Sequence, residues 1–186
     1  MKSASDPGLI VAGTSEVSTA RLMFYDGVSL FKVTNFASLP SFTFEYLGDG
    51  TFFQYLDGTE TPIYAVNDKG ALRLTVGSVI DYLAFFFSHV TGEGGDETLL
   101  VKNPHDMPML DSLDPGAYDA VIRGHQPAQV KDQDDGGFVV DADIYDSGQL
   151  SRAQIAVSPS GRVVILARKM ILQSVARGLE SEHYLA

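Results

Sequence analysis

Hydrophobic and polar residues alternate in short runs along much of the chain, and this pattern predicts a β-rich protein. Between Leu22 and Val76 the runs are rich in Phe, Tyr, Leu, Val and Thr and are separated by Asp-Gly and Lys-Gly steps. Such steps favour tight turns, because glycine accepts a positive φ without a Cβ clash. We therefore expect hairpins here. In the clearest hairpin, residues 42–47 pair with residues 51–56, and in a second hairpin residues 62–67 pair with residues 71–76.

A helical spacing replaces this alternation after Ser78. Apolar residues recur every three or four positions up to Val90, and Ser78 with Asp81 has the spacing of a capping box. The run Phe85-Phe86-Phe87 widens the apolar face beyond one stripe, so the helix is expected to be largely buried. We expect this run and the aromatic residues of the hairpins to pack in the core. A ligand cavity lined by them is the alternative.

The C-terminal third predicts a strand over residues 118–130 and then two hairpins, with turns at residues 146–149 and 158–161. If Tyr145 pairs with Leu150 and Val157 pairs with Arg162, one face of this sheet is apolar throughout. The opposite face also collects apolar residues, namely Val139, Ala156, Val163, Ile165 and Ala167. Such a patch is rarely open to water. We expect a two-fold dimer or another part of the same chain to cover it.

These elements predict an α+β protein in which a helix packs across a curved antiparallel sheet, as in cystatin-like or NTF2-like folds. A two-sheet or barrel-like arrangement with one buried helix is the alternative. Residues 1–15 are rich in small and turn-forming types and are expected to be loosely ordered. Residues 16–186 are expected to form a single domain, since no linker or repeat interrupts them.

The amino-acid composition limits the kinds of site that the chain can form. The chain has 45% hydrophobic and 20% charged residues, as is typical of globular proteins, and it has no cysteine. Disulfides, thiolate nucleophiles and cysteine-based metal sites are therefore excluded. The longest apolar runs are too short for a signal peptide or a membrane-spanning helix, so we expect a soluble, cytoplasmic protein. The net charge of −11 disfavours nucleic acid as a partner.

The known catalytic and metal-binding motifs have no good match here. There is no Gly-x-Ser-x-Gly and no His-Glu-x-x-His, and residues 132–137 start like a calcium loop but lack its later ligands. We expect a solvated turn at residues 132–137, no metal and no cofactor. Whether the protein is an enzyme stays undecided at this stage.

Two functions remain. The first is a non-enzymatic interaction module that binds a protein partner or a second copy of itself, which the absence of catalytic motifs favours. The alternative is a small-molecule-binding domain or minor enzyme with a pocket between helix and sheet. His105, Asp106 and His125 are the candidate ligand-binding residues for that pocket, because they belong to the densest group of side chains able to do acid–base work.

Overall fold

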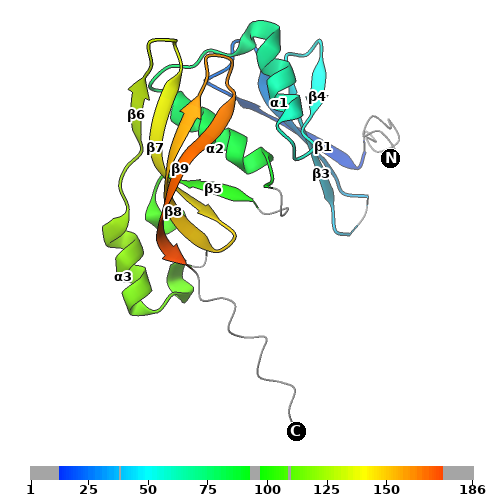
Figure 1. Cartoon of the computed structure of the whole chain (residues 1–186). Helices are drawn as coiled ribbons and strands as arrows, with labels where there is room; N and C mark the ends of the chain where they lie inside the picture. Colours follow the sequence, from blue (N-terminus) through cyan, green and yellow to red (C-terminus); the bar gives the residue numbers. More distant parts are fainter. Residues whose placement is uncertain (1–12, 38, 93–96, 109, 174–186) are drawn as a thin grey trace.

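The computed structural model describes residues 13–37, 39–92, 97–108 and 110–173. Within these ranges the chain forms antiparallel sheets and a few helices, which confirms the α+β class (Figure 1). The strands belong to two sheets, as in the alternative arrangement, and not to one. The helix α2 (Val79–His89) lies between them, and one hydrophobic cluster draws residues from α2 and from both sheets.

The N-terminal sheet is a four-stranded antiparallel meander. Its strands lie in the order β1 (Ser15–Arg21), β2 (Ser29–Asn35), β3 (Phe42–Gly48) and β4 (Phe53–Tyr55). The expected pairing of residues 42–47 with 51–56 is confirmed by β3 and β4, in which Tyr46 faces Tyr55. The intervening turn is held by the Asp49 carboxylate, which accepts hydrogen bonds from the backbone amides of Thr51 and Phe52 at 2.7 and 3.1 Å.

The second expected N-terminal hairpin, residues 62–67 with 71–76, is wrong. The chain there forms α1 (Thr61–Val66), followed by a wider helical turn, Asn67–Ala71. Proline suits the first turn of a helix, where its fixed φ is already helical, and Pro62 occupies that place. Ile63 and Val66 stand three residues apart and are both fully buried, so one helical face satisfies the apolar pattern.

The buried helix is confirmed. Within α2, Phe85, Phe86 and Phe87 are 7%, 6% and 6% exposed. The expected capping box is wrong, because the Ser78 hydroxyl accepts from the Thr75 amide at 3.0 Å and Asp81 forms an ion pair with Lys102 at 2.5 Å. In the described part of the chain, no helix has both the length and the apolar character needed to cross a bilayer.

The C-terminal sheet is larger. Its path runs β5 (Thr98–Val101), β7 (Phe138–Asp146), β8 (Gln149–Val157) and β9 (Val163–Gln173). A further strand, β6 (Gln129–Asp132), also pairs with β7. Since β5 pairs with residues 143–146 and β6 with residues 138–141, the two share one edge of β7. The turn expected at residues 132–137 is confirmed between β6 and β7.

The register of the first C-terminal hairpin is confirmed, and that of the second is wrong by one residue. Tyr145 faces Leu150 as expected, but Val157 faces Val163 and not Arg162. The turn contains one residue more than expected, with Gly161 at a φ of +77° and the Ser158 amide bonded to the Arg162 carbonyl. Since adjacent side chains of a strand point to opposite faces, Val163 and Ile165 turn toward the core, and Val164 turns away.

The strand expected over residues 118–130 is also wrong in its first part. Residues there form α3 (Pro115–Gly124) before β6 begins. The Asp114 carboxylate caps the helix by accepting from the amides of Gly116 and Ala117 at 2.9 and 3.0 Å, and Pro115 occupies the first turn. A second, smaller hydrophobic cluster joins α3 to the far face of the C-terminal sheet; its buried members are Val101, Met107, Leu110, Val121 and Leu150.

A buried hydrogen-bond network connects the segment before β2 to the turn between β8 and β9. The Tyr25 hydroxyl donates to the Asn67 side-chain oxygen at 2.7 Å, and the Asn67 amide group donates to the Tyr82 hydroxyl at 3.0 Å. Tyr82 in turn donates to the Gly161 carbonyl at 2.6 Å. Glycine is required at position 161, because a Cβ there would lie 2.5 Å from the Asn67 amide nitrogen and the φ is positive.

Candidate functional site

The three residues predicted to bind a ligand do not share one environment. His105 and Asp106 belong to a short 3-10 turn, Pro104–Asp106, in which the Asn103 side chain accepts from the His105 amide. Both side chains are exposed. His125 follows the last residue of α3 and is largely buried, with a side chain 12% exposed. Among the described residues no hydrogen bond or ion pair joins His125 to the other two, and their role as a pocket stays a prediction.

His125 belongs instead to a buried charged cluster on β7 and β8. Its Nδ1 lies 2.8 Å from one carboxylate oxygen of Asp143, whose side chain is fully buried. The second carboxylate oxygen accepts from the Arg152 guanidinium at 3.1 Å. Asp143 and Arg152 are direct cross-strand partners, as the first hairpin register predicts. The contact with His125, 18 positions away along the chain, has no local signal in the sequence.

The contacts of this cluster favour an anchoring role. Arg152 also donates to the carbonyl oxygens of Gln126 and Pro127 at 2.7 and 3.3 Å, and the Gln126 amide donates to Asp143 at 3.2 Å. These bonds fix the connection between α3 and β6 onto the sheet. A carboxylate that orients a histidine also occurs at catalytic and metal centres. The described residues, however, contain no group of three acidic or histidine side chains placed to hold a metal ion.

A second candidate site is the outer face of the N-terminal sheet, on the side away from α2. The strand registers place the side chain of every second residue on this face, and most of these side chains are aromatic or aliphatic. We call this surface the aromatic face; it consists of Val17, Phe31, Val33, Phe42, Phe44, Tyr46, Phe53 and Tyr55. This finding corrects the expectation that the aromatic residues of these hairpins pack in the core.

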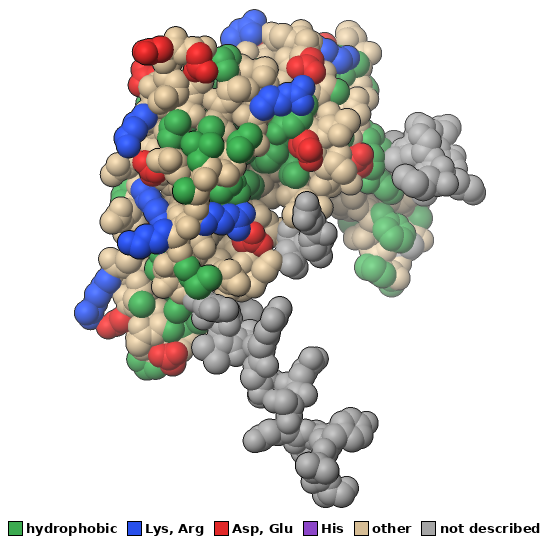
Figure 2. Space-filling model, viewed as in Figure 1, with side chains coloured by type: hydrophobic (Ala, Val, Ile, Leu, Met, Phe, Trp, Pro, Cys, Tyr) green, Lys and Arg blue, Asp and Glu red, His purple; other side chains and the backbone are tan. Residues whose placement is uncertain are grey.

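The aromatic face is open to solvent only in part, because Val33 is buried and four of its rings, namely Phe31, Phe44, Tyr46 and Tyr55, are half-buried. Val17, Phe42 and Phe53 are 58%, 54% and 56% exposed. The rings of Phe31 and Phe53 meet edge to face with centroids 5.0 Å apart. Gly48 permits this contact, because a Cβ at that position would lie 2.8 Å from a ring carbon of Phe53. Figure 2 shows hydrophobic side chains gathered at the end of the β2–β3 hairpin.

The opposite face of the same sheet is more polar, although it is the one turned toward α2. Leu30 and Leu47 join the main core, but farther along the strands Lys32 pairs with Glu45 at 2.6 Å. Glu45 also lies 3.0 Å from the His89 ring nitrogen at the end of α2. The sheet therefore carries the Lys32–Glu45 ion pair on the side of the helix and most of its aromatic side chains on the opposite side.

A third candidate is the outer face of the C-terminal sheet, where we expected an apolar patch of five residues covered by a second copy or by another part of the chain. Two of them, Val163 and Ile165, pack against the main core because of the shifted register. The cluster around α3 covers the lower part of this face, next to Leu150 and Tyr145. Only its upper part is open, where Val164 is 56% exposed and Val139 and Ala156 are half-buried.

The chain was also compared with known proteins. No protein-family model, no curated protein and no solved structure matches it. The likeness to cystatin-like or NTF2-like folds therefore stays a prediction, and the function is argued from the geometry alone.

Proposed function

We propose that the protein is a self-associating interaction module, and that a second copy of the chain packs on its aromatic face about a two-fold axis. The observation that supports this proposal is the apolar outer face of the N-terminal sheet, on which Val17, Phe42 and Phe53 are more than half exposed. Monomeric proteins seldom leave such a face open, because water contact with a contiguous apolar patch is unfavourable. The sequence pointed to a dimer through the C-terminal sheet, and the proposal moves it to the N-terminal one.

The charge distribution favours a second copy as the occupant. The chain has a net charge of −11, so two copies repel one another at most orientations. The aromatic face avoids this repulsion: by the strand registers it contains no acidic side chain, and its only charged residue is Arg21 at one end of β1. In a two-fold contact the same patch meets itself, so an apolar, uncharged face is complementary to its own copy.

The size of the face sets the expected affinity. Three strands of seven residues and one of three, about 4.8 Å apart and rising about 3.4 Å per residue, cover roughly 400 Å² in projection. Stable interfaces bury about 800 Å² of accessible surface on each partner. The aromatic face falls short of this unless neighbouring loops contribute, so we expect a weak dimer with a dissociation constant in the micromolar range.

Sedimentation velocity from low micromolar to several hundred micromolar protein tests the proposal. We expect the parent chain to shift from monomer to dimer over this range, and Phe42→Glu to remain monomeric because two carboxylates would be buried at the contact. Leu166→Glu is the matched control, since Leu166 is also 54% exposed but lies on the C-terminal sheet. Circular dichroism should show that both variants are folded.

Two results would contradict this assignment. A parent chain that stays monomeric at several hundred micromolar would exclude self-association at any useful concentration. If Leu166→Glu dissociated the dimer and Phe42→Glu did not, the chain would self-associate, but through the C-terminal sheet.

A further inference from the structure

The last strand of the C-terminal sheet has an edge whose middle part is covered by nothing in the described part of the chain. β9 has 11 residues, more than any other strand in the described ranges, and within those ranges it pairs with β8 on one side only. An edge strand presents a row of backbone amide and carbonyl groups that can pair with another strand. Natural proteins usually keep such edges short, so an open edge of this length calls for an explanation.

The edge begins where α1 stops covering it. The backbone amide of Val163 donates to the Tyr64 hydroxyl of α1 at 3.1 Å, and the Arg162 guanidinium lies over the Tyr64 ring, 4.3 Å from its centroid. Beyond Val163, no described residue outside β8 forms a hydrogen bond with the backbone of β9. The open edge therefore runs from Val164 to Met170, with one irregularity at Leu166, before Ile171 and Leu172 pack against the cluster around α3.

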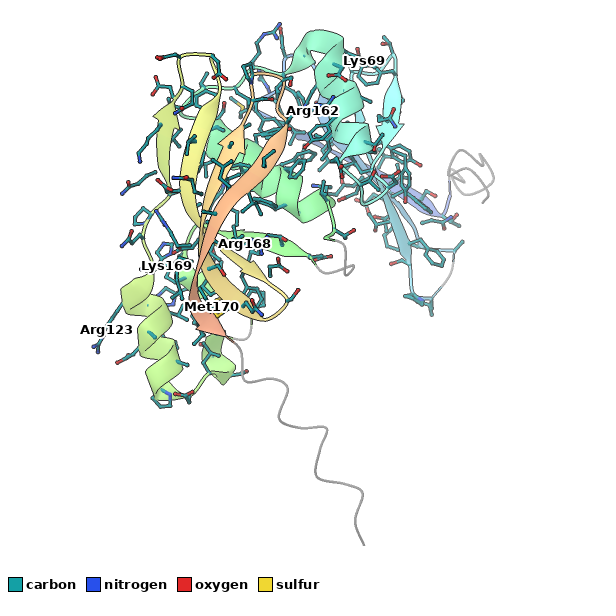
Figure 3. All side chains as sticks on the ribbon, in the orientation of Figure 1. Lys69, Arg123, Arg162, Arg168, Lys169 and Met170 are labelled. Carbon is teal, nitrogen blue, oxygen red and sulfur yellow. The ribbon has the colours of Figure 1, made fainter. Side chains whose placement is uncertain are left out.

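The side chains along this edge combine apolar contact area with positive charge. Val164, Leu166 and Met170 are 56%, 54% and 51% exposed. Arg168 pairs with Asp146 at 2.9 Å, but Lys169 has no ion pair with any described residue. Figure 3 shows Arg168, Lys169 and Met170 along the last half of the strand and Arg162 near its start.

This charge selects the kind of strand that can bind. From Arg162 to Gln173 the chain has three bases and no acid, whereas the whole chain has a net charge of −11. Two β9 strands paired antiparallel near Arg168 would bring the basic side chains of both copies together, which is destabilising. A strand with acidic side chains would meet them favourably, and its backbone would satisfy the open edge.

We propose that the outer edge of β9 binds an extended, acidic peptide segment of a partner protein by strand addition. The partner's backbone pairs with β9 beyond Val163, the carboxylates on one of its faces meet Lys169, and the apolar side chains on its opposite face pack beside Met170. This site is separate from the aromatic face, so a dimer would present two such edges.

Binding of a synthetic peptide tests the proposal. The probe is a fluorescent acetyl-EVEVEVE-amide, measured by anisotropy against full-length protein, with acetyl-KVKVKVK-amide as the charge-reversed probe and an N-methylated EVEVEVE as the backbone probe. We expect the acidic peptide to bind at least about 10-fold more tightly than either of the other two, because one loses charge complementarity and the other loses backbone hydrogen bonds.

Two variants locate the site. Lys169→Glu should weaken acidic-peptide binding at least about 5-fold, whereas Lys131→Glu should change it less than about 2-fold. Lys131 is the matched control because it is exposed, lies on the edge strand β6 of the same sheet and undergoes the same charge change. Circular dichroism of both variants excludes unfolding.

Four other results of these experiments would overturn the proposal. Equal binding of the N-methylated peptide would exclude strand addition, and equal weakening by both variants would mean that the peptide responds to net charge only. No binding of the acidic peptide at millimolar concentration would exclude this class of partner. If Lys169→Glu instead promoted dimerisation in sedimentation experiments, the edge would be one that pairs with a second copy.

Discussion

The two sheets each turn one face toward α2 and one face away from it, and the outer faces differ in what covers them. On the C-terminal sheet, α3 and its neighbouring turns cover the lower part of the outer face with a hydrophobic cluster of their own. On the N-terminal sheet, no described helix covers the aromatic face, where Phe42 and Phe53 are more than half exposed. Both faces carry apolar patches, so the presence of apolar residues alone does not say which patch is open.

The two outer faces also differ in the charged groups that can attach a covering segment to the sheet. The outer face of the C-terminal sheet contains one buried carboxylate, Asp143, which holds Arg152 and His125 and so fixes the end of α3. The aromatic face has no comparable charged group. The cover of the C-terminal sheet thus combines a polar anchor with apolar contact, and the described residues form no comparable anchor on the aromatic face.

The largest expected effect comes from removing that anchor. Asp143→Ala leaves Arg152, which is 19% exposed, without its carboxylate, and should lower the free energy of unfolding by about 3–5 kcal/mol. Lys32→Ala removes a charged partner from the open sheet, where Lys32 is 47% exposed, and should cost less than about 1 kcal/mol. Urea unfolding measures both. Equal costs would mean that Asp143 does not anchor α3 as described.

A smaller effect is expected from the apolar contacts themselves. Leu150→Ala should cost about 2–4 kcal/mol, because Leu150 is 2% exposed beneath α3 and its removal leaves a cavity. Phe53→Ala on the aromatic face should cost less than about 1 kcal/mol, since much of its ring already contacts water. Both variants are unfolded in urea at low micromolar concentration, where self-association contributes little. A larger loss in Phe53→Ala would show that the aromatic face is covered.

The smallest expected effect concerns the network that joins the two halves. Burial raises the pKa of Tyr25 and Tyr82 well above the ordinary value of 10.0. Above pH 10 the unfolded chain loses these protons while the folded chain keeps them, so stability is complete below pH 10 and falls as the pH rises further. The loss should be about 1.4 kcal/mol per pH unit for each tyrosine.

Tyr25→Phe distinguishes this network from general alkaline unfolding. The variant loses the hydrogen bond to Asn67 at pH 8, but its stability should fall less steeply than that of the parent between pH 10 and pH 11. Thermal or urea unfolding across that range gives the two slopes. Identical slopes would mean that Tyr25 does not keep its proton in the folded state.

Local sequence patterns correctly predicted those elements whose length or turn residues fit few types of secondary structure. The helix over Val79–His89 and the register that pairs Tyr145 with Leu150 are both found in the structure. They were predictable because 11 residues of helical spacing, and two strands joined by a tight turn, each have few alternatives. The same pairing placed Asp143 opposite Arg152, which is half of the charged cluster.

Short or irregular segments were not predictable in this way. Residues 62–67 and 118–124 read as strands but form α1 and α3, because a short apolar run fits either structure and packing decides between them. The turn between β8 and β9 also takes up Arg162, which shifted the start of β9 by one position. In a strand, that shift exchanges the two faces, so it moved Ile165 into the core and exposed Val164.

The sequence by itself determined the α+β class, the buried helix and the first C-terminal hairpin, because these depend on periodicity and on turn residues that are close in the chain. Only the tertiary structure decided which apolar faces are open. The contacts that settle this question, between His125 and Asp143 and between α3 and Leu150, join residues 18 or more positions apart. Their formation depends on how whole elements pack, which no local pattern encodes.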